Sequence, residues 1–339
     1  MCLWKTDRRL SPKIILLLIL PFLCTGCLVF EKQTIHAIYD EKADVVHAVL
    51  VYEGLHVSGT DKQNLKNAKF DLQDLVKDND SFYIANPIVR IRLSELKNPP
   101  KLGEFDKEYA DMILTHVSLT PGKMFVKDKD KLCYSQGLTI RQAKSFVAKA
   151  NHLISRDIIK NAKRANQGNP KQPEWQKELQ KKILIAAQNK HAWIRLQPGR
   201  LSVTTPMNDQ ALANAKLSLL ALDRLDEFKK RLKDTAKRKD WKTYQSMVDG
   251  QFKNQEFLGL LLKSNVISLD HRKDSATFSV GYGGTEPIPG VFPFFEDPEK
   301  LTKYDKEFQE YAKTLQEEWD NNTTVERVLT DFRKKHLPK

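Results

Sequence analysis

The sequence predicts an α+β protein in which short antiparallel hairpins and a strand meander are interspersed with long amphipathic helices. Glycine and proline are scarce, 14 and 15 of 339 residues, which disfavours a turn-dense all-β fold and favours helices. The predicted strands come in hairpins separated by pairs of helices. Because single strands do not alternate regularly with single helices, the pattern disfavours a doubly wound parallel sheet. A hydrophobic content of 40% is enough to build a core.

The first part of the body is predicted to begin with a hairpin, since residues 34–39 and 45–51 are rich in β-branched and aromatic side chains. A helix is expected over 61–77, where Leu65, Ala68 and Leu72 keep one face apolar. A half-buried strand is expected over 88–93, where Arg90 and Arg92 alternate with apolar residues. A three-stranded meander is then predicted at 112–119, 123–127 and 132–139, with turns at 120–122 and 128–130.

The second part is more helical. A long amphipathic helix is predicted from Ile140, with an apolar stripe formed by Ile140, Ala143, Val147, Ala150, Ile154, Ile158 and Ala162. Beyond it we expect helices at 175–190, 209–239, 301–319 and 323–336, and strand pairs at 192–197 with 200–205 and at 266–270 with 276–282. The sequence therefore divides into a signal peptide at 1–26, an α+β part at 27–166, a linker at 167–174 and a helix-rich α+β part at 175–339. The last three can also form one continuous domain.

The N-terminal segment indicates export. Four basic residues precede an apolar run over 14–23, and the run leads to Cys24, Thr25, Gly26 and Cys27. This is the layout of a signal peptide with a small-residue cleavage site. The Gly26–Cys27 junction resembles the lipobox of bacterial lipoproteins, although Cys24 stands where that family usually has leucine. The resemblance implies cleavage before Cys27 and attachment of diacylglycerol to its thiol, so that the mature chain is anchored to a membrane of the cell envelope.

Two alternatives to the lipoprotein interpretation stay open. Residues 14–30 form a 17-residue stretch without charge, which is at the short limit for an uncleaved membrane anchor. An ordinary secretory signal is the other alternative. In the lipoprotein interpretation Cys133 is the one remaining thiol of the mature chain, so no internal disulfide is expected. Its apolar neighbours predict a buried strand cysteine.

The sequence carries no strong catalytic motif. It contains no His-Glu-x-x-His, no Gly-x-Ser-x-Gly and no pair of Cys-x-x-Cys motifs. The usual motifs of a zinc metalloprotease, an α/β-hydrolase and a zinc ribbon are therefore missing. No cofactor is expected. The one constellation of interest lies in the first hairpin, where a loop that pairs Tyr39 with Asp44 would place His36 directly opposite His47. Two such histidines could hold a metal, with Glu53 or His56 as a third ligand.

Charge is unevenly distributed. The chain carries 56 Lys and Arg against 43 Asp and Glu. Residues 141–253 alone hold 25 basic and 10 acidic residues, while the chain from Cys27 onward has a net charge of +10. On the predicted long helix we define the basic face as Arg141, Lys149, Arg156, Lys160 and Lys163. A second basic cluster lies at 229–239. Such a face is either simply solvated or attracted to an anionic surface.

The sequence therefore predicts an exported, membrane-anchored envelope protein with a binding or scaffolding role. Its expected partners are the membrane, through the lipid, and an anionic lipid or envelope polymer, through the basic face. Nucleic acid is not expected, because export separates the chain from it. The alternative is an envelope hydrolase with its site around the first hairpin.

Overall fold

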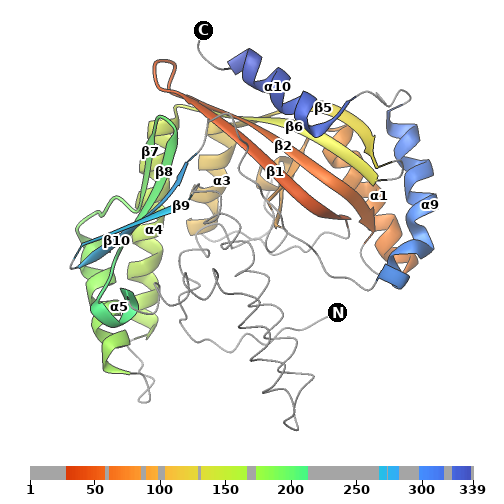
Figure 1. Ribbon diagram of the computed structural model, residues 1–339. Coiled ribbons are helices and arrows are strands. Elements are labelled where there is room, and N and C mark those ends of the chain that lie inside the picture. Colours follow the sequence, from red (N-terminus) through yellow and green to blue (C-terminus); the bar gives the residue numbers. More distant parts are fainter. Residues whose placement is uncertain are drawn as a thin grey trace, which may run out of the picture.

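The computed structural model describes residues 28–57, 61–84, 89–97, 104–128, 131–165, 173–212, 267–272, 274–281, 298–316 and 323–336. The protein is α+β, with two four-stranded antiparallel sheets, a small two-stranded sheet and helices packed on them (Figure 1). None of the helices in these ranges is long and apolar enough to span a membrane.

The first sheet has the strand order β1-β2-β6-β5. Its strands are β1 (Leu28–Asp40), β2 (Val45–Val57), β5 (Val117–Lys127) and β6 (Lys131–Arg141). The first hairpin is thus confirmed and longer than predicted. Gly54 has a φ of 68°, and a Cβ there would lie 2.6 Å from the Glu31 side chain, so this close approach of β1 and β2 requires glycine.

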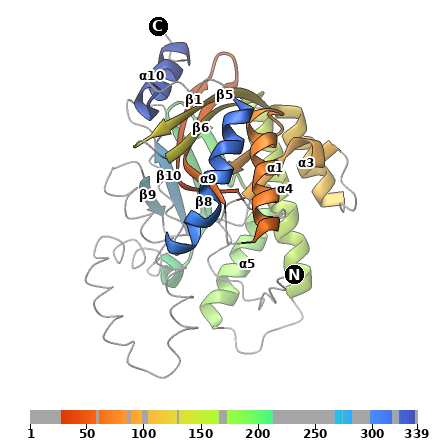
Figure 2. The same ribbon diagram turned by 90° about the vertical axis from the view of Figure 1, so that its right-hand side faces the viewer.

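One face of the first sheet carries the main hydrophobic core. It is covered by α1 (Lys62–Val76), α3 (Glu104–His116), α9 (Pro298–Leu315) and the small sheet of β3 (Ser81–Ile84) and β4 (Val89–Arg92). Figure 2 shows α9 alongside α1. Because Phe308 of α9 is fully buried with Leu28 and Tyr52, the core joins residues from both ends of the chain.

The other face of the first sheet is covered by α10 (Val325–His336), which lies across the strands in Figure 1. Val325 and Leu329 of this helix pack on Val49, Val51, Phe125 and Cys133. This helix and α9 confirm the two helices predicted near the C-terminus.

The second sheet has the order β7-β8-β10-β9. Its strands are β7 (Ile194–Gln197), β8 (Arg200–Pro206), β9 (Ile267–Arg272) and β10 (Ser275–Gly281), and it packs with α4 (Ala143–Ala165) and α5 (Glu174–Gln188). Both predicted hairpins of this part are confirmed. The amide of Asn151 on α4 bonds both the backbone N–H and the C=O of Ile194, which joins the long helix to the edge strand β7.

The predicted meander is wrong in its first strand. Residues 112–116 belong to α3, in which Ala110 and Met112 are buried; the predicted turn at Pro121–Gly122 lies inside β5 as an irregularity in its pairing with β6. A Cβ on Gly122 would lie 1.9 Å from the carbonyl oxygen of Ser135. The glycine therefore allows the paired strands β5 and β6 to approach each other closely at this irregularity. The chain does not reverse direction there.

Candidate functional site

The histidines of the first hairpin do not face each other as predicted. His36 pairs with Val49, and His47 pairs with Ile38. The reason is the loop: Asp40 accepts hydrogen bonds from the backbone N–H groups of Lys42 and Ala43, and Asp44 has a φ of 53°.

Since Asp44 lies in the left-handed region, it cannot extend the ladder, and the last pair is Asp40 with Val45. The pairing is displaced by two residues, which leaves His36 and His47 on the same face but diagonal to each other.

The surroundings of His36 are closed, whereas His47 is half-buried. His36 is 1% exposed, and its ring contacts Phe332 of α10 with the centroids 5.6 Å apart. The His47 ring stacks on His336, also of α10, at 4.1 Å. Burial lowers the pKa of both hairpin histidines, which favours the neutral imidazole.

Glu53 and His56 do not join the hairpin histidines. Glu53 is 3% exposed, and its carboxylate is 2.7 Å from Lys127 Nζ and 3.3 Å from Lys32 Nζ. Since Glu53 lies four residues along β2 from the partner of His36, the two side chains are separated by about 13 Å of strand. Nδ1 of His56 lies 2.7 Å from the carbonyl oxygen of Gly54. Among the described residues, no group of three or more His, Cys, Asp or Glu side chains is arranged to hold a metal.

Cys133 is a buried strand residue, as predicted. It lies on β6 opposite Glu53 and is fully buried beneath α10. Burial raises the pKa of its thiol to about 11, so the thiolate that nucleophilic chemistry requires is disfavoured. Within the part of the chain that the structure describes, it is the one cysteine and has a free thiol.

The basic face is only partly a helical surface. Arg141 is the last residue of β6 and is exposed, because α4 begins at Ala143 and not at Ile140. Lys160 is exposed and Lys149 is half-buried.

Arg156 of the basic face is not simply exposed. It forms an ion pair with Glu108 of α3, and this pair links α4 to α3. The side chain of Lys163, like the basic cluster at 229–239, lies outside the described residues. Of the described members of the basic face, Arg141 and Lys160 are therefore exposed to solvent, and Lys149 is partly exposed.

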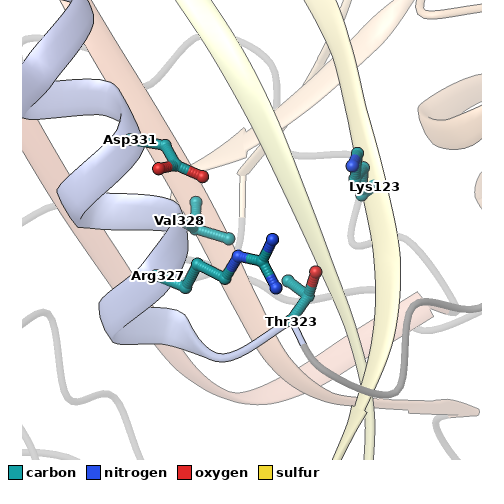
Figure 3. A pocket seen from close by; sticks show the side chains of 5 residues that line it. All are labelled: Lys123, Thr323, Arg327, Val328 and Asp331. Carbon is teal, nitrogen blue, oxygen red and sulfur yellow. The ribbon is translucent and has the colours of Figure 1, made fainter.

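A shallow hollow of about 180 Å³ lies between α10 and β5. Arg327 and Val328 project from the helix toward the strand that carries Lys123, and Thr323 and Asp331 complete the lining (Figure 3). The lining combines two cationic side chains with one carboxylate, so it shows no clear preference for an anion or a cation.

Sequence reasoning missed a buried ion-pair network between α1 and β4, formed by Asp71, Asp74, Arg90 and Arg92. Asp71 and Asp74 are 3% and 1% exposed. Arg90 pairs with Asp71, and Arg92 pairs with Asp74 at 2.6 Å. Burial raises the pKa of Asp74 to about 6 against the opposing effect of Arg92.

The signal for this network was present in the sequence. Asp71 and Asp74 stand among the apolar positions of α1, and Arg90 and Arg92 alternate with apolar residues on β4. The alternation by itself predicts a half-buried strand with one solvated face. The structure shows that α1 covers this face and that its aspartates pair with the two arginines. The network therefore has a structural role at the edge of the core.

No protein-family model matches this chain, and neither the curated proteins nor the solved structures contain a significant match to it.

Proposed function

We propose that the protein is an exported, membrane-anchored component of the cell envelope with a binding or scaffolding role, attached through a lipid on Cys27. The observation that supports this best is the N-terminal sequence: four basic residues precede an apolar run over 14–23, and the run leads to the lipobox-like Gly26–Cys27 junction.

The environment of the first hairpin supports a binding role over the alternative of an envelope hydrolase. A hydrolytic site would bring His36, His47 and Glu53 together in an accessible cleft. Instead His36 is enclosed by α10, and Glu53 is held by two lysines farther along the strand. Arg141 of the basic face is exposed at the hairpin end of the first sheet, where it pairs with Val45, and Lys160 is exposed farther along α4. We assign the basic face contact with an anionic surface.

The test of the anchor is Cys27→Ala in the full chain. If Cys27 carries the lipid, the variant should accumulate as an uncleaved or mislocalised precursor and should not incorporate a labelled fatty acid. Cys24→Ala, three residues earlier, is the matched control and should still be labelled. Labelling that persists in Cys27→Ala would contradict the proposal, and membrane attachment without labelling in the unmodified chain would indicate an uncleaved anchor.

A further inference from the structure

The contact between α10 and the first sheet is a narrow one. Val325 and Leu329 of the helix are buried on an apolar strip formed by Val49, Val51, Phe125 and Cys133, and the partly buried Val328 and Phe332 pack against the same cluster. At the C-terminal end of the helix the contact consists of aromatic and imidazole rings. Since few apolar side chains hold this helix, its attachment depends strongly on the rings.

Phe332 contacts two histidines at this end, and a third histidine stacks on one of them. The rings of His36 and Phe332 lie 5.6 Å apart in an edge-on contact. His336 lies 4.8 Å from Phe332 and stacks on His47 at 4.1 Å with an interplanar angle of 26°. Within the described part of the chain, Nε2 of His36 is buried without a hydrogen-bond partner. Such a packing suits neutral rings, because two stacked imidazolium ions would repel each other.

The charged groups around the rings are mostly cationic. The last turn of α10 carries Arg333, Lys334 and Lys335. Arg333 lowers the pKa of His36, and Lys335 lowers the pKa of His47 and of His336. On the sheet side, the charge of Asp40 raises the pKa of His47. Burial is the largest cause for all three histidines. Together with the charges of His47 and Lys335, burial lowers the pKa of His336 to about 4.

We propose that α10 is an acid-released strap: neutral histidines hold it on the sheet, and their protonation detaches it and uncovers Val49, Val51, Phe125 and Cys133. The strap is a property of the described fold and does not depend on the proposed lipid anchor. It gives the protein a second state in which an apolar strip of its first sheet is open to solvent.

The direction of the pH effect follows from linkage. A histidine whose pKa is lowered by docking binds fewer protons in the docked state than in the released state. Its contribution to docking is therefore fully present above its ordinary pKa of 6.5 and is lost as the pH falls toward 4. For His336 alone, a pKa of about 4 when docked makes the ratio of released to docked helix rise about 20-fold between pH 7 and pH 5.

Cys133 is the reporter for the experiment, because it lies under α10. In the full chain with Cys2, Cys24 and Cys27 replaced by serine, Cys133 is the one thiol. Its rate of reaction with 4,4′-dithiodipyridine is measured from pH 7.5 to 4.5 in the folded chain and in the urea-denatured chain. The ratio of the two rates is the protection of the thiol, and it cancels the intrinsic pH dependence of the reaction. We expect protection to fall at least tenfold between pH 7 and pH 5 while circular dichroism changes little.

His336→Phe keeps a ring in the stack but cannot be protonated, so it should retain most of the protection at pH 5. His152→Gln removes an exposed histidine of α4 and should behave like the unmodified chain. Constant protection over the whole range would overturn the proposal. So would an equal loss in His336→Phe, or a loss of protection that occurs only together with unfolding of the whole chain.

Discussion

At the residue scale, the most consequential side chains are the four of the buried ion-pair network. Arg90 and Arg92 cross from β4 to the two aspartates of α1 with only 13% and 19% of their side-chain surfaces exposed. Ion pairs this deeply buried add little net stability, but loss of one partner leaves an uncompensated charge. The network therefore constrains how α1 and β4 pack together.

Removing one arginine of the network should be costly. Arg92→Met is expected to lower the free energy of unfolding at pH 7.5 by about 3 kcal/mol or more, because Asp74 then remains buried without its partner. The double variant Arg92→Met with Asp74→Leu should recover much of that loss. Urea unfolding of both variants measures the difference, with Lys77→Gln on the exposed end of α1 as a control. A loss below 1 kcal/mol for Arg92→Met would show that the pair is solvated.

At the element scale, α4 shows how far periodicity identifies a packed face. Ala143, Ala150 and Ile154 of the predicted stripe are buried, so the interpretation of an amphipathic helix is confirmed. Leu153 and Ser155 are buried as well, because α4 is enclosed by α3 on one side and by α5 and β7 on the other. A helix with several packing partners buries more than one stripe.

The stability lost on substitution along α4 should therefore depend on how deeply each side chain is buried. Ile154→Asp should destabilise the fold most, by about 3 kcal/mol or more, because it places an unpaired charge beside Ala187 and Trp193. Val147→Asp and Ile158→Asp, at half-buried positions, should cost less. Lys160→Asp, at an exposed position, should change the free energy of unfolding by less than about 1 kcal/mol. Similar melting shifts for Ile154→Asp and Lys160→Asp would contradict the packing described for this helix.

At the scale of the whole molecule, positive charge is concentrated in residues 141–212, which begin far from Leu28, the residue next to the proposed lipid anchor. Residues 27–140 contain 15 Lys and Arg against 17 Asp and Glu, whereas residues 141–212 contain 14 against 4. Arg141 lies opposite Val45, which in turn pairs with Asp40, so the basic part of the chain begins at the hairpin end of the sheet. Leu28 is at the other end of β1, 12 residues or about 40 Å of strand away.

The basic face should bind anionic surfaces through its exposed members. A chain that begins at Leu28 is expected to sediment with vesicles that contain anionic lipid, or to bind an anionic polymer, at low salt; binding should fall steeply as salt rises. Neutral vesicles should not bind.

A charge-matched pair of variants tests whether the effect is local. Replacing Arg141, Lys149 and Lys160 by Gln should remove most of the binding. Replacing Lys62, Lys66 and Lys77 by Gln removes the same charge from exposed positions in α1 and directly after it and should have a smaller effect. Equal losses in the two variants would mean that only net charge matters, and no binding at low salt would mean that the basic face is simply solvated.

The sequence by itself determined the fold class, the two hairpins of the second sheet, most helices and the burial of Cys133. These features depend on side-chain periodicity and composition within short segments. Such patterns can be recognised without knowing which other segments pack against them. The lipobox-like junction is equally local, and the lipid attachment that it predicts stays a prediction.

Only the tertiary structure decided the features that depend on segments far apart in the chain. The register of the first hairpin followed from an aspartate-capped loop, and Pro121–Gly122 lies within a strand because Ser135 of β6 approaches it closely. The partners of Arg90 and Arg92 come from α1, and the rings that enclose His36 and His47 come from α10, nearly 300 residues later. A sequence pattern shows that a face must be covered; which side chains cover it, and therefore which charges and rings meet, is decided when distant elements pack together.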